Sequence, residues 1–159
     1  MSIVAGSLSS YRGVARGFQG QGNDSETGTT GDGVGSVGCY ELDPTGGAVN
    51  VIAGSNIPYQ VVNGPDELAL SIVGGLITVP QGTYRITLTG LSVTATVQTV
   101  YIDGAPGTQV LQIESPTDYA SLSGSTIVEV TSSVRVVSGA TRDYVQTRGG
   151  NVLLLEKLA

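Results

Sequence analysis

The chain has 159 residues, of which 40% are hydrophobic and only 13% charged, and its net charge at pH 7 is −6. Its seven lysines and arginines are too few to displace counterions along a nucleic acid, so we expect no nucleic-acid partner. The sequence has no histidine, which removes the commonest general base and a frequent zinc ligand. It therefore predicts no catalytic residues, no metal site, no cofactor and no enzyme activity.

Hydropathy and cysteine content narrow the class further. No segment approaches about 18 consecutive apolar residues, so we expect no membrane partner. The first five residues lack a basic region and a long apolar run, and we expect the protein to be used without export. Cys39 has no partner for an internal disulfide. We interpret it as a small half-buried side chain, with an intermolecular bridge in an oxidising setting as the alternative.

Residues 1–42 form a segment of unusual composition. Ten of the 24 glycines lie in the first 40 residues, and glycine loses much backbone entropy on ordering. We expect an extended N-terminal arm, which is either a floppy terminus or a segment that orders on a partner surface. Tyr11, Arg12, Arg16 and Phe18 lie within eight residues and are the residue types that anchor interfaces, so they are the candidate partner-binding residues.

Residues 43–159 are predicted to form a β-sandwich domain. Short apolar runs recur with Gly, Pro, Asn and Asp between them, a pattern typical of an all-β sandwich or barrel. Apolar and polar residues alternate strictly over 83–89 and 91–97, on either side of Gly90. Asp103-Gly104 predicts a hairpin. Three further connections are predicted: a turn at 63–66, pairing of 127–130 with 134–137 around 131–133, and a loop over 139–150.

The closing run, residues 152–158, does not alternate. Four consecutive apolar residues, Val152 to Leu155, predict a strand that needs cover on both faces. One face can meet the domain's own core, and the other most simply meets a second copy of the chain. The alternative is that a loop of the same chain covers the second face.

Four stretches in this order resemble the domain shared by C1q and tumour necrosis factor (TNF). The segment Ile77-Thr-Val-Pro-Gln-Gly-Thr-Tyr-Arg-Ile resembles that family's F-x-V-P-x-G-x-Y segment, with Ile77 in place of the usual aromatic residue. The hairpin at 101–106, the strand region 122–136 and the closing segment 150–158 resemble later parts of the same domain. The resemblance covers about residues 50–159 and does not extend to the arm.

This resemblance implies a C1q/TNF-like jelly-roll sandwich of ten strands that assembles as a homotrimer. It places Tyr84, Leu153 and Leu155, or their neighbours of opposite parity, at the trimer interface. Among family members, a short acidic chain with a glycine-rich arm is most similar to the bacteriophage versions. The predicted function is therefore a capsid decoration (cement) protein on the outer surface of the virion. Its arm would bind the major capsid protein and stabilise the shell.

The alternative function is a receptor- or glycan-binding head of a phage tail fibre or spike. Such a head would place its binding chemistry on loops far from the arm. The two candidate loops are Ser115 to Ser123 and Ala140 to Gly149.

Overall fold

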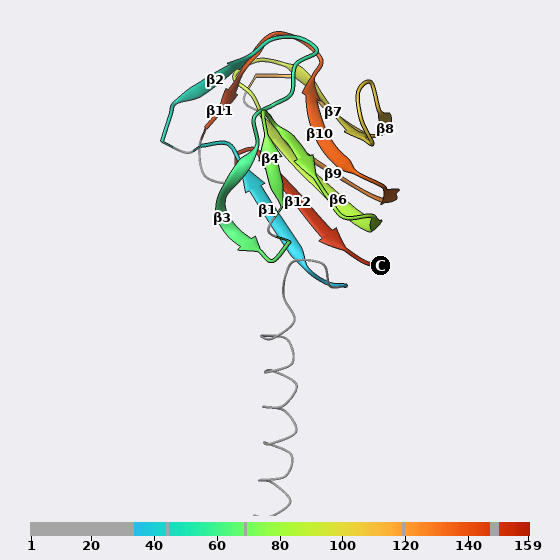
Figure 1. Ribbon diagram of the computed structural model, residues 1–159. Coiled ribbons are helices and arrows are strands. Elements are labelled where there is room, and N and C mark those ends of the chain that lie inside the picture. The colour runs from blue at the N-terminus through green and yellow to red at the C-terminus, as the bar shows by residue number, and fades with distance from the viewer. Residues whose placement is uncertain (1–33, 44, 69, 119, 147–149) are drawn as a thin grey trace, which may run out of the picture. The chain divides into compact units, whose positions relative to one another are not determined.

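The structure is a computed structural model that describes residues 34–159 except 44, 69, 119 and 147–149 (Figure 1). Residues 31–159 form one compact unit. The candidate anchors Tyr11, Arg12, Arg16 and Phe18 lie outside the described residues, and so does most of the predicted arm.

All regular elements in the described part are β-strands, twelve in number, which confirms the prediction of an all-β fold. In chain order they are β1 (Val37–Glu41), β2 (Ala48–Val51), β3 (Gln60–Asp66), β4 (Ser71–Val73), β5 (Leu76–Thr78), β6 (Gly82–Leu91), β7 (Thr96–Ile102), β8 (Thr108–Ser115), β9 (Ser121–Val130), β10 (Ser133–Ser138), β11 (Arg142–Val145) and β12 (Val152–Lys157).

Ten of these strands form two antiparallel five-stranded sheets, as expected for a jelly-roll sandwich. Sheet I has the order β3-β1-β12-β6-β9, and sheet II has the order β4-β5-β10-β7-β8. Strands β2 and β11 pair as a separate ribbon. Figure 1 shows β12, the last strand of the chain, lying between β1 and β6 in the middle of sheet I.

The two-residue alternation of the sequence builds the core between the sheets. Tyr84, Ile86 and Leu88 of β6 have no exposed surface, and they lie beside Leu153 and Leu155 of β12, which have none either. Val100, Val134 and Val136 supply the facing layer from sheet II. Burying side chains of this size from both sheets is the main favourable contribution to folding.

The domain begins earlier than residue 43, so the predicted boundary is corrected. Strand β1 pairs with β12 on one side and with β3 on the other. The ladder continues outward through hydrogen bonds from Gly35 N to Lys157 O (2.6 Å) and from Lys157 N to Ser36 O (2.9 Å). Because glycines lie on either side of β1, its composition resembles that of the arm, and the sequence analysis therefore assigned it to the arm. Tyr40, which is fully buried, ties it to the core.

Two predicted connections contain strands. The Asn63-Gly-Pro-Asp segment lies within β3 and makes no turn there. The pairing of β3 with β1 shifts register between Gly38 and Tyr40, and Gly64 has φ of 153°, so the turn-type residues accommodate an irregularity in the strand. The predicted loop over 139–150 contains β11, which pairs with β2.

The predicted pairing of β9 with β10 is also wrong, because the two strands belong to different sheets. Strand β9 pairs with β6, whereas β10 pairs with β5 and β7. The backbone N–H groups of Thr131 and Ser132 both donate to Asp103 Oδ1 at 2.8 Å. This carboxylate supplies the acceptors that a hairpin would otherwise provide, and the chain crosses from sheet I to sheet II.

The predicted hairpin at Asp103-Gly104 is confirmed as the connection between β7 and β8. Asp103 has φ of 58° and Gly104 has φ of 100°. Both lie in the left-handed region, which Asp and Gly tolerate better than other residues.

Candidate subunit interface

The outer face of sheet I is set by the register of its central strands. Leu154 of β12 lies opposite Cys39 of β1 and Thr87 of β6. Val152 lies opposite Glu41 and Thr89 in the same way. Because neighbouring positions on β12 are buried in the core, these side chains point away from it. The predicted two-sided strand is therefore present, with Leu153 and Leu155 facing inward and Val152 and Leu154 facing outward.

The structure resolves the choice of parity that the sequence left open. Tyr84, Leu153 and Leu155 are 0% exposed within one chain, so these three side chains have no surface with which to contact a second copy. The Tyr84 hydroxyl donates to Pro80 O at 2.8 Å inside the same protomer. Their neighbours of opposite parity, such as Arg85 and Leu154, face outward and are the residues that we expect at the interface. The existence of a trimer stays a prediction.

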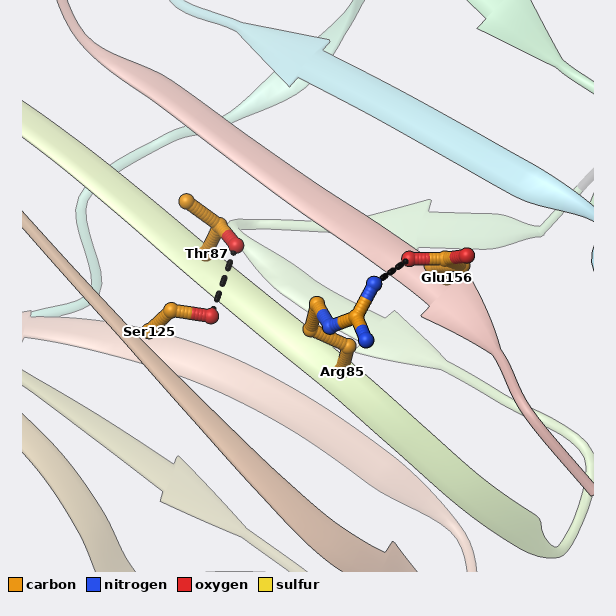
Figure 2. A network of polar contacts seen from close by, with 4 residues as sticks. All are labelled: Arg85, Thr87, Ser125 and Glu156. Carbon is orange, nitrogen blue, oxygen red and sulfur yellow. Dashed lines mark hydrogen bonds and ion pairs between the residues drawn. The ribbon is translucent and has the colours of Figure 1, made fainter.

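The polar side chains near the centre of this face pair with one another (Figure 2). Arg85 Nη1 of β6 lies 2.7 Å from Glu156 Oε2 of β12 in an ion pair, with side chains 46% and 30% exposed. The hydroxyls of Thr87 and Ser125 are hydrogen-bonded at 2.9 Å between β6 and β9. Mutual pairing lowers the penalty of removing these groups from water, which suits a surface that a partner covers.

Strand β1 adds two residues to this face that the sequence analysis placed in the arm. Cys39 is half-buried, as expected; burial first, and then the charge of Glu41, raises the pKa of its thiol, so it stays protonated and behaves as a small apolar side chain. Glu41 is only 6% exposed, and its Oε2 has no hydrogen-bond partner among the described residues. A buried carboxylate oxygen without a donor is unfavourable.

The sequence contained one signal that could have located β1. Val37, Cys39 and Glu41 alternate with Gly38 and Tyr40 as a strand would, but five residues beside a glycine-rich stretch are too few to stand out.

Metal-ligating side chains do not cluster in the described part of the chain. No group of three or more Cys, Asp or Glu side chains gathers there in a way that could hold a metal ion. Within the same ranges, no helix has the length and apolar character needed to cross a bilayer.

Comparisons with known proteins identify the fold. A scan against protein-family models and a search of curated proteins both find no match. Among solved structures, Eiger TNF from S. frugiperda aligns with a TM-score of 0.62 and 17% identity, over 80% of this chain and 94% of its own. The globular domain of zebrafish complement 1qA aligns with 0.54 and 14%, over 76% and 96%. Vertex protein P5 of phage PRD1 aligns with 0.50 and 11%, over 80% and 99%.

These similarities confirm the C1q/TNF-like jelly-roll fold predicted from the sequence motifs. The chain aligns over nearly the whole length of each structure, so the likeness extends to the complete domain. At 11–17% identity the likeness shows the fold alone.

Proposed function

We propose that this chain is a viral structural protein: a homotrimeric capsid decoration (cement) protein with no enzyme activity. The observation that carries the proposal is the outer face of sheet I. There, Val152 and Leu154 face outward and the nearby polar groups pair with one another. A second and third copy would cover this face. The shared fold of a phage vertex protein supports the viral setting.

In this proposal the protein sits on the outer surface of the virion. The N-terminal arm binds the major capsid protein through Tyr11, Arg12, Arg16 and Phe18 and thereby stabilises the shell. Three arms share one head, so each bound arm raises the effective concentration of the next. Ordering a glycine-rich arm is entropically unfavourable, and spreading contacts over several capsid subunits offsets that loss.

Deleting residues 1–33 tests the division of labour between head and arm. This cut leaves Gly35 and Ser36, whose backbone groups bond Lys157. The truncated protein is expected to sediment as a trimer and to lose binding to capsids of the virus that encodes it. In the full-length chain, replacing the four anchors by serine should have the same effect. The matched control, Asp24→Asn with Glu26→Gln, changes the same arm and should bind as the parent does.

Two results would overturn the proposal. If the full-length protein sediments as a monomer at micromolar concentration, the proposed homotrimer is excluded. If the truncated trimer still decorates shells at full occupancy, the arm is not the segment that binds the capsid.

The second candidate function is a glycan-recognising head. It is favoured by one specific observation, a pocket at the end of sheet II that adjoins both loops expected for such a site.

A further inference from the structure

A pocket of about 320 Å³ lies where three strands of sheet II come to their ends. Strand β7 begins there, β8 ends there, and the chain leaves β10 for β11. The residues that matter for its chemistry are Ala95, Thr96, Glu114, Pro116, Ala140 and Arg142. The volume is at the lower end of the range for small-molecule sites and suits one ring-sized group.

Arg142 is held rigidly at this pocket. Its Nε donates to Ala95 O at 2.7 Å, and its Nη1 donates to Thr141 O at 2.8 Å. These two bonds fix the plane of the guanidinium group, while Nη2 has no hydrogen bond within the described part of the chain. A donor that is already oriented loses little entropy when it binds a ligand.

Two lining residues of the pocket, Thr96 and Ala140, are also held in place by a small network of hydroxyl groups. The Tyr144 hydroxyl contacts Thr96 Oγ1 at 3.2 Å and Ser138 Oγ at 2.6 Å, and Ser138 Oγ donates to Ala140 O at 2.5 Å. Nearby, Ala95 N donates to Asp118 Oδ1 at 3.1 Å, which ties the β8–β9 connection to β7. The pocket is therefore preformed.

The charges around the pocket identify the class of ligand. Arg142 offers donors, and the exposed Glu114 carboxylate offers acceptors. A strongly anionic ligand would be attracted by Arg142 but repelled by Glu114 and Asp118. A neutral ring with neighbouring hydroxyls can use both sets of groups, because each hydroxyl both donates and accepts.

We propose that this pocket binds the terminal ring of a neutral hexose glycan, with Arg142 and Glu114 bonding adjacent hydroxyls. The pocket opens to solvent beside the two loop regions, which leaves room for the rest of a chain of sugars. The inference does not depend on attachment to a capsid.

Saturation-transfer NMR on the full-length protein tests the site directly. The probes are the methyl glycosides of glucose, galactose and mannose, with the methyl glycoside of sialic acid as an anionic comparison. At least one neutral probe is expected to bind. Glu114→Gln and Arg142→Lys should each weaken that binding about tenfold, since the first replaces a charged acceptor by a neutral one and the second loses the planar, fixed guanidinium donors. Glu129→Gln, the same charge change on the exposed side of β9, should leave it unchanged.

Arg142 also donates to backbone carbonyls, so the fold of its variant must be checked. Glu114→Gln is therefore the variant whose result decides the test. Glu114 is exposed at the end of β8, and its variant should keep the parent's circular dichroism spectrum and sedimentation. The proposal is overturned by the absence of transfer from every neutral probe up to roughly 50 mM. It is also overturned by unweakened binding in Glu114→Gln, or by preferred binding of the sialoside. Capsid binding measured on the same variants separates this outcome from the proposed function.

Discussion

The outer faces of the two sheets differ in the contacts that their own chain makes with them, although Arg135 Nε on sheet II and Glu41 Oε2 on sheet I are both buried without a hydrogen-bond partner among the described residues. On sheet II, the Arg135 guanidinium lies 5.2 Å from the centroid of the Tyr101 ring and donates to Pro106 O at 2.6 Å and Asn56 Oδ1 at 3.3 Å. The chain covers part of this sheet itself, since Gly54 N bonds Ser138 O. On sheet I, Val152 and Leu154 face outward and are half-buried within one chain.

The central strands of the two sheets also differ in the apolar character of their outer faces. Strand β10 places Val134 and Val136 inward and places Arg135 and Val137 outward, so one polar and one apolar side chain share its outer face. Strand β12 is apolar on both sides through four consecutive residues. We therefore expect sheet I, whose central strand carries the longer apolar run, to be the sheet that meets another molecule.

The largest effect is expected from placing a charge on the outer face of sheet I. Leu154→Asp would bury three carboxylates, one from each copy, which is unfavourable on the order of several kcal/mol per chain. The variant should sediment as a folded monomer at concentrations where the parent is a trimer. Sedimentation equilibrium measures the change.

Val73→Asp is the matched control for that change. Val73 is 75% exposed on β4 of sheet II, and the same charge there should leave assembly intact. If Leu154→Asp and the parent gave the same mass, the contrast between the faces would fail.

The next largest effect is expected one residue along the same strand. Leu155 is 0% exposed and packs beside Ile86, so Leu155→Ala should lower the free energy of unfolding by about 2–5 kcal/mol. Urea denaturation monitored by circular dichroism measures this in the monomeric Leu154→Asp background, where assembly does not contribute. Leu154→Ala, compared with the parent at a concentration low enough for both to be monomers, should change unfolding far less. Equal losses at both positions would contradict the assignment of inner and outer faces.

A smaller, pH-dependent effect is expected at the corner where the chain passes between the sheets. Burial by itself would raise the pKa of Asp103, but the hydrogen bonds from the Ser132 and Thr131 backbones outweigh it and lower the pKa below its ordinary value of 3.8. The folded state therefore favours the charged form. Its stabilising contribution is complete above the ordinary pKa and is lost as the pH falls through the lowered value.

Asp103→Asn keeps the shape and tolerates positive φ, so it isolates the charge. It should lower the free energy of unfolding at pH 7 by about 1 kcal/mol, and the difference from the parent should shrink toward zero below pH 3.8. Asp66→Asn, on an exposed strand carboxylate, is the control. A difference that stayed constant with pH would exclude the charge as its source.

The sequence could predict what depends on local pattern. Alternation around Gly90 predicted β6, and the unbroken apolar run predicted the two-sided β12. Parity and pairing depend on residues distant in the chain: Leu154 faces outward because β12 lies between β1 and β6 in one register. The crossing between the sheets at Thr131 depends on the carboxylate of Asp103, 28 residues earlier. Turn propensities describe neighbouring residues only and could not predict this contact. Arg142 is a candidate ligand-binding residue only because the fold brings the start of β7 and the ends of β8 and β10 together.

The smallest effect is expected from the ion pair at the centre of the face, and it depends on whether the face is covered. In a free protomer, with side chains 46% and 30% exposed, Arg85 and Glu156 should couple by less than about 1 kcal/mol, and salt should weaken the coupling. A double-mutant cycle with Arg85→Ala and Glu156→Ala measures this in the Leu154→Asp monomer. In the parent trimer the same cycle should give a larger coupling that salt screens less, because a covered pair is desolvated. Equal coupling and equal salt dependence in the monomer and the trimer would mean that the ion pair stays exposed to solvent in both. Copies of the chain would then meet through another surface.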